Sequence, residues 1–183
     1  MNKNLGNIFG AAKVGVCLAG ILVLSSNSYA SDKVVGASLY ELHIVENTTG
    51  GREILAGDYN AAIEKIRVSL SMDSKYVEAT NLCAAHIAHK EFIQAEAYCK
   101  AALRASRSFH TGLQSTTWGR AAAKANRAMA LNNLGVLNAL KGNSGAAHEF
   151  FESAGKRSYR LRLTSDRNIQ VLEQRMVSEV ASS

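Results

Sequence analysis

The sequence predicts an all-α protein built from stacked helical hairpins, and three observations support this. Two stretches follow one template, the first beginning NLCAAH at Asn81 and the second NLGVL at Asn133. The 183 residues contain no proline, which would interrupt helix interiors. Alanine and leucine, both strong helix formers, are abundant. Self-similarity in units of a few dozen residues is typical of repeat arrays, which present binding surfaces.

Residues 1–30 have the layout of a cleavable secretory signal peptide. Two lysines flank the start of an apolar run at 14–24, which is too short to span a bilayer, and small residues precede the expected cleavage after Ala30. We therefore predict a periplasmic or secreted protein. The alternatives are a lipoprotein signal ending at Cys17 and a retained membrane anchor.

The first elements after the signal are short. Residues 31–49 alternate weakly in polarity and are predicted to form a short strand or an extended N-terminal arm. A TTGG break follows, in which Thr49 is expected to cap a short helix at 52–56. A glycine and an aspartate then turn the chain into a helix at 59–72, whose apolar residues recur at helical spacing.

The middle of the chain carries the clearest helical patterns. A well-formed pair of helices is predicted at 76–89 and 92–105, with an apolar stripe along the second. The polar connection at about 106–117 is longer than a repeat needs. Helical patterns return at 118–140 and 145–156, separated by a KGNS turn.

The last element lies in residues 159–183. Thr164, Ser165 and Asp166 are good helix-capping residues, so we expect the helix to begin there. It places three apolar residues on one face and is predicted to cap the open end of the stack. These residues are Ile169, Leu172 and Met176.

These patterns resemble tetratricopeptide repeat proteins, in which a helix rich in small residues packs against a second helix entered through Gly-x-Tyr-x-x-Ala. The sequence GDYNAA at 57–62 matches that entry, and the templates at Asn81 and Asn133 match the core of the first helix. Alanines that allow close helix approach in the family match Ala95, Ala102, Ala147 and Ala154.

The resemblance covers residues 50–158 and implies a superhelix of about three hairpins followed by a capping helix. The chain also resembles small secreted repeat proteins of proteobacteria. One departure is that Leu82 and Leu134 lie 52 residues apart, which indicates an insertion between the second and third units. The resemblance implies an adaptor that binds other proteins.

Charges are segregated along the chain, because no acidic residue lies between Glu96 and Glu149. This asymmetry indicates an acidic protein surface or an anionic envelope component as partner rather than nucleic acid. Two rows of cations at helical spacing flank the long connection and are predicted to form a partner-binding basic patch, with a solvated face as the alternative. The patch comprises Lys100, Arg104, Arg107, Arg120, Lys124 and Arg127.

A second candidate surface is the groove face of the predicted first helices, which is unusually apolar for a surface open to water. Either it accepts an apolar helix or strand from a partner, or the arm around residues 39–45 folds back into it. The groove residues are Thr80, Ala84, Ile87, Ala88, Asn132, Val136, Ala139 and Leu140.

Cys83 and Cys99 are the only cysteines after residue 30. In an exported protein such a pair allows a disulfide, although two buried free thiols are the favoured interpretation. Cys83, His86 and His89, at three-residue spacing, are the nearest approach to a metal site, but core packing is favoured for them. No catalytic motif, metal site or cofactor site is predicted.

The sequence therefore predicts an exported, non-enzymatic adaptor that binds a protein partner with an acidic or apolar segment. Two alternatives stay open. One is a metal-binding or small-ligand-binding helical module that uses Cys83 and His86. The other is a basic module that associates with an anionic envelope polymer or, secondarily, a membrane surface.

Overall fold

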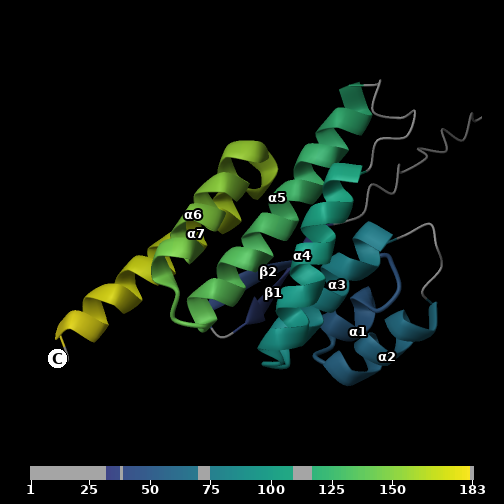
Figure 1. Cartoon of the computed structure of the whole chain (residues 1–183), viewed down its shortest axis with the longest axis horizontal. Coiled ribbons are helices and arrows are strands. Elements are labelled where there is room, and N and C mark those ends of the chain that lie inside the picture. Colours follow the sequence, from purple (N-terminus) through teal and green to yellow (C-terminus); the bar gives the residue numbers. More distant parts are fainter. Residues whose placement is uncertain (1–31, 38, 70–74, 109–116, 182–183) are drawn as a thin grey trace, which may run out of the picture.

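The computed structural model describes residues 32–37, 39–69, 75–108 and 117–181, which form seven helices and a two-stranded sheet (Figure 1). The predicted helical class is therefore confirmed, with one small sheet added. The predicted signal peptide and most of the predicted long connection lie outside the described residues. The elements are β1 (Asp32–Ala37), β2 (Tyr40–Val45), α1 (Gly51–Leu55), α2 (Tyr59–Ser69), α3 (Lys75–Ala88), α4 (Phe92–Ser108), α5 (Thr117–Leu140), α6 (Ser144–Arg157) and α7 (Tyr159–Ala181).

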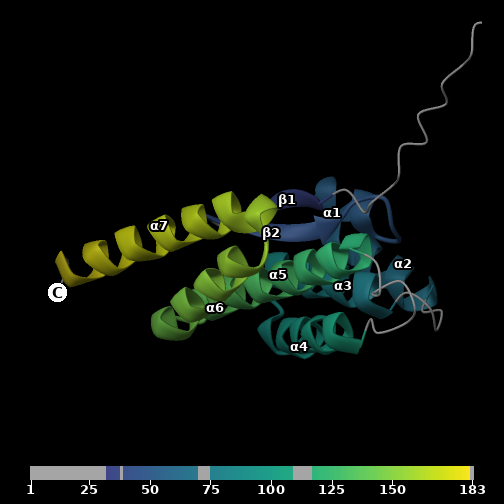
Figure 2. The ribbon, with the colours of Figure 1, turned by 90° about the horizontal axis from the view of Figure 1, so that it is seen from above.

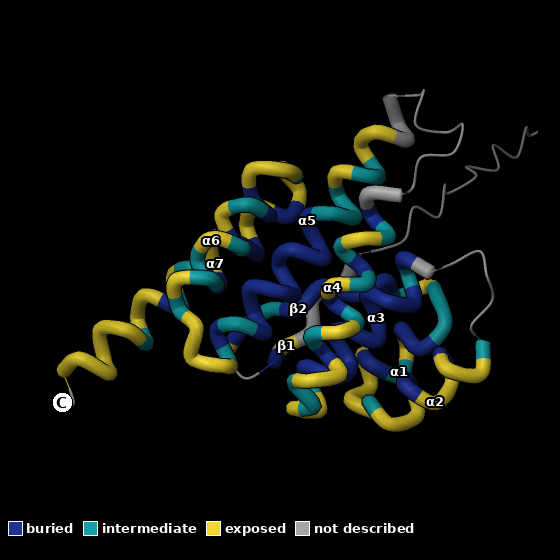
Figure 3. The backbone as a smooth tube through the Cα atoms, in the orientation of Figure 1, coloured by how far each residue is buried: buried dark blue, intermediate teal, exposed yellow. Residues whose placement is uncertain are grey.

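Helices that follow one another in the chain pack side by side, so α3 packs on α4, α5 on both α4 and α6, and α7 on α6. The antiparallel hairpin of β1 and β2 lies across α3, α5 and α7 (Figure 2). Buried residues concentrate in β2, α3 and the second half of α5 (Figure 3). None of the helices in the described ranges has both the length and the apolar character of a membrane span.

The short helix α1 begins without the predicted threonine cap. Gly50 is the N-cap, with a left-handed φ of 79°, and no side chain caps the helix. The backbone carbonyl of Thr49 instead accepts a hydrogen bond from Asn81 on α3. Glycine is required at position 50 because a Cβ there would lie 2.5 Å from the side chain of Ile66. The prediction that Thr49 caps this helix is therefore wrong.

The predicted start of the last helix is also wrong. α7 begins at Tyr159, with only Ser158 between it and the end of α6, so Thr164 and Ser165 lie inside the helix and are buried. A Cβ on Gly155 of α6 would lie 3.6 Å from that of Ser165, an ordinary van der Waals distance, so the buried Ser165 packs against α6. Thr164 and Ser165 therefore act as small residues buried in α7 and not as caps of its first turn.

The far end of α7 extends beyond the rest of the stack (Figure 2). Leu172 is buried and Ile169 is half-buried, as expected of a capping helix, but Met176 is 47% exposed. The predicted apolar face therefore packs against the body only along the first part of the helix.

The contact of α5 with α6 depends on one glycine. A Cβ on Gly135 would lie 2.5 Å from the ring of Phe151, which is fully buried. We expect Gly135→Ala to lower the free energy of unfolding by about 2 kcal/mol, because the larger side chain overpacks the contact. Urea denaturation measures this change. Gly145→Ala is the matched control, since nothing lies within 4 Å of a Cβ at Gly145, and an equal loss there would contradict the explanation.

Candidate functional site

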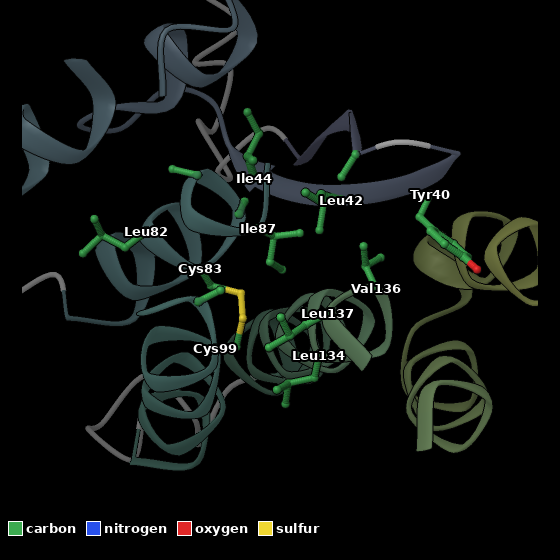
Figure 4. Close-up of a cluster of buried hydrophobic side chains, with 14 of the residues drawn as sticks. Tyr40, Leu42, Ile44, Leu82, Cys83, Ile87, Cys99, Leu134, Val136 and Leu137 are labelled. Atoms are coloured by element: carbon green, nitrogen blue, oxygen red, sulfur yellow. A yellow bond between two sulfur atoms is a disulfide. The ribbon is translucent and has the colours of Figure 1, made fainter. Parts of the chain in front are cut away.

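The predicted groove is filled by the chain's own strand β2. Leu42 and Ile44 of β2 belong to one buried apolar cluster with Ile87 of α3 and Val136 of α5 (Figure 4). The groove was expected to hold either a partner segment or the N-terminal arm, and in the structure it holds the arm. Six predicted groove residues are buried and two are half-buried, the latter being Ala88 and Leu140.

Three asparagines, one each from α3, α5 and α7, hold the backbone of β2. Each accepts a hydrogen bond from a β2 N–H group through Oδ1, at 2.8 Å. Each also donates through Nδ2 to the carbonyl oxygen of the same β2 residue, at 2.9, 2.8 and 3.1 Å for α7, α5 and α3. We call this set the asparagine ladder. It pairs Asn168 with Glu41, Asn133 with His43 and Asn81 with Val45.

The ladder and β1 occupy opposite edges of β2. Backbone groups of successive strand residues point to alternate edges, so Glu41, His43 and Val45 share the edge that faces the ladder. The other edge faces β1, whose register pairs Ala37 with Tyr40 at the turn. The helices therefore recognise β2 through its backbone, by contacts that do not depend on the side chains of Glu41, His43 and Val45.

Additional contacts reinforce the α7 end of the ladder. Asn132, which was predicted as a groove residue, donates to the carbonyl oxygen of Glu41 at 2.9 Å and accepts from Asn168 at 3.1 Å. The Glu41 carboxylate also forms an ion pair with Arg167 at 3.2 Å, in a more exposed setting. This end of the strand is thus held by two helices at once.

Two side chains of β2 are buried without hydrogen-bond partners among the described residues. Tyr40 stacks on Phe151 with ring centroids 6.3 Å apart, and its hydroxyl has no partner there. Both ring nitrogens of His43 also lack a partner, and burial lowers the pKa of this histidine to about 4. The backbone of β2 thus has hydrogen-bond partners, whereas polar atoms of two of its side chains do not. Burying polar atoms without partners lowers stability.

A disulfide joins Cys83 of α3 to Cys99 of α4 beneath the groove (Figure 4), with the two Cα atoms 4.8 Å apart. The structure therefore has the bonded alternative, not the two free thiols favoured from the sequence. The bond fastens one groove wall to the helix behind it. It also removes the Cys83 thiolate from the metal site considered above.

The two histidines considered for that site, His86 and His89, lie in different environments. His86 is buried, stacks on Tyr98 with centroids 5.1 Å apart, and contacts the Glu91 carboxylate through Nδ1 at 2.5 Å. Burial lowers its pKa, and the bond to Glu91 opposes this effect. His89 is more exposed, 3.8 Å from Glu91. Across the described ranges, no three side chains of metal-binding type come together.

The predicted basic patch spans α4 and α5. These helices are antiparallel neighbours, so the end of α4 and the start of α5 meet at one end of the molecule (Figure 1). Four of the cations are exposed, whereas Arg127 is half-buried and the Arg107 side chain lies outside the described part of the structure. The exposed cations are Lys100, Arg104, Arg120 and Lys124.

One acidic residue reduces the charge of this surface. Glu96 pairs with Lys100 at 2.6 Å and with Lys141 at 2.7 Å, and these hydrogen bonds lower the pKa of Glu96 to about 2. Lys100 is thus partly neutralised within its own helix. Arg104, Arg120 and Lys124 are the other exposed cations of the predicted patch.

The asparagine ladder was not predicted from the sequence. Its signal was present, since Asn81 and Asn133 open the two matching templates and an asparagine is costly to bury inside a helix unless its amide has partners. Asn168 does not belong to a recognisable template. The sequence signal was therefore an asparagine at the same position of both templates.

A scan against protein-family models matches none of them, and searches of curated proteins and of solved structures give no significant match. The resemblance to tetratricopeptide repeat proteins therefore rests on the residues quoted above.

Proposed function

We propose that this protein is an exported adaptor of tetratricopeptide-like architecture that binds an acidic segment of a protein partner through the exposed cations of α4 and α5. The observation that carries the proposal is the antiparallel packing of these two helices, which brings both rows of cations to one end of the molecule. The chain has no acidic residue between Glu96 and Glu149. We call the exposed cations Arg104, Arg120 and Lys124 the basic surface.

Two features support the architecture and the compartment. The pairs α1 and α2, α3 and α4, and α5 and α6 follow one another within residues 50–158, as three repeats with a capping helix would. The Cys83–Cys99 disulfide suits an oxidising compartment, where such bonds persist. The disulfide agrees with a signal peptide at 1–30.

The chemistry of the basic surface favours an acidic segment. Exposed cations attract an oppositely charged partner over distances of about the Debye length, roughly 8 Å at physiological salt. Such contacts mainly raise the association rate and select the partner, and they weaken as salt increases. While β2 occupies the groove, the basic surface is the exposed one of these two candidate surfaces.

Charge reversal at two positions tests the proposal. We expect Arg104→Glu with Lys124→Glu to weaken binding of a labelled poly-glutamate peptide about tenfold and to flatten its salt dependence. Fluorescence anisotropy over a salt series measures both effects. Arg127 is spared because its half-buried side chain would couple the change to folding.

The matched control reverses two exposed cations elsewhere, Lys156→Glu with Arg160→Glu, which changes the net charge equally. If the control loses as much affinity as the test variant, net charge alone governs binding and the basic surface is not a site. If only the test variant loses affinity, the natural partner is the protein that an envelope extract yields with the wild type and the control variant but not with the test variant.

The same exposed cations support a second candidate, association with an anionic envelope polymer or lipid surface. Pelleting with vesicles of one-third anionic lipid distinguishes the two candidates. Binding to vesicles that poly-glutamate does not displace at matched charge concentration would favour the surface over the protein segment.

A further inference from the structure

We propose that β2 is an exchangeable occupant of its groove, and that an extended segment of a partner protein takes its place when that segment has apolar residues where β2 has Tyr40 and His43. The groove is here the face of α3, α5 and α7 that carries the asparagine ladder. This site is separate from the basic surface, so either proposal can fail without the other.

The first observation is that the groove recognises backbone. Each rung of the ladder uses both hydrogen-bonding groups of one strand residue, as the bonds of Asn133 to the N–H and carbonyl of His43 show. Every amino acid except proline has these two groups. The ladder therefore fits any extended segment of suitable length and does not select β2 over another strand.

The second observation is that β2 is an imperfect occupant. The Tyr40 hydroxyl and both ring nitrogens of His43 are buried and have no hydrogen-bond partner among the described residues. Each such group weakens an association by roughly tenfold relative to an apolar replacement of similar shape. A segment with phenylalanine and leucine at these two positions keeps the backbone bonds and removes all three unsatisfied atoms.

The third observation concerns the remaining positions, which define what the partner must offer. The aromatic ring at position 40 stacks on Phe151, and Leu42 and Ile44 are fully buried in the cluster with Ile87. The partner segment is therefore an extended strand in which the five residues corresponding to positions 40–44 are, in order, aromatic, variable, aliphatic, apolar and aliphatic. The side chain of Glu41, at the variable position, is the partly exposed one.

Covalent attachment gives β2 an advantage that the partner must overcome. A strand joined to the groove by a short connection has an effective concentration of the order of millimolar. The Thr48 hydroxyl and the Asn81 amide further fix the connection that follows β2. A partner with the same side chains as β2 would lose this competition, whereas the two apolar replacements shift it in the partner's favour.

Two labelled eight-residue peptides test the exchange with the purified protein. One is LYELHIVE, the chain's own residues 39–46, and the other is LFELLIVE. Fluorescence anisotropy should show the second binding at least tenfold more tightly. Equal binding of the two peptides would overturn the proposal.

A variant of the protein supplies the reciprocal arm. Tyr40→Phe with His43→Leu improves the attached strand, so the variant should remain folded and bind LFELLIVE at least tenfold more weakly. Val68→Ala, at an 83% exposed position on α2, should leave peptide binding unchanged. If the improved strand has no effect, the peptide binds elsewhere and the proposal is wrong. If the protein forms dimers that LFELLIVE dissociates, the occupant is the hairpin of a second copy, and the partner assignment is overturned.

Discussion

Replacing Asn133 with leucine is expected to lower the free energy of unfolding by about 4 kcal/mol, a large part of the stability of a domain this size. The substitution keeps the number and branching of the side-chain heavy atoms but removes both hydrogen bonds to the backbone of His43, at 2.8 Å each. Two buried backbone groups then have no partner, at roughly 1–3 kcal/mol each. Urea denaturation followed by circular dichroism measures the loss.

The control is Asn138→Leu on the same helix. Asn138 is half-buried; its amide donates to the Leu134 carbonyl one turn away and accepts an exposed 3.5 Å bond from Asn143, so the expected loss is below about 1 kcal/mol. If Asn133→Leu were no more damaging than this control, β2 would contribute little to stability. The asparagine ladder would then be incidental to the fold.

Acidification is the second large expected effect. Burial lowers the pKa of His43 to about 4, compared with 6.5 when the side chain is free. Between these values the unfolded chain binds a proton that the folded protein does not, so stability falls as the pH falls. The loss begins near pH 6.5, amounts to about 2.5 kcal/mol at pH 4.5 and levels off below the folded pKa.

Unfolding free energies at pH 7, 5.5 and 4.5 measure this loss, and His43→Leu isolates it. Burial also lowers the pKa of His86, which adds a change of the same sign in both proteins. The shift of Glu96 to about 2 acts mainly below pH 4.5. The wild type should therefore lose about 2.5 kcal/mol more than His43→Leu by pH 4.5, and parallel pH profiles would contradict the assignment.

The helices could be predicted from sequence because their signals are local. α3 and α4 match the expected 76–89 and 92–105 within three residues, since apolar spacing and the intervening turn specify a helix by near neighbours. The start of α7 could not be predicted in this way. Whether Ser165 caps a helix or packs against Gly155 depends on α6, and no local pattern contains that information.

The site was less predictable for a related reason. The apolar groove and an arm able to fill it were both visible, because Ile87, Val136 and the alternation around residue 42 are sequence features. The asparagine ladder depends on three helices meeting one strand. Asn168 and Glu41 are 127 residues apart, so neither residue indicates the other.

That separation also determines the order in which the molecule can be completed. Asn168 follows Glu41 by 127 residues, so β2 gains its hydrogen bonds to α7 only after all the intervening helices have been made. Such long-range contacts raise the contact order above that of a simple helical bundle, so this protein should fold more slowly than one. Until α7 is made, the backbone of Glu41 lacks its two hydrogen bonds to Asn168, and a chaperone that shields extended segments would act at this stage.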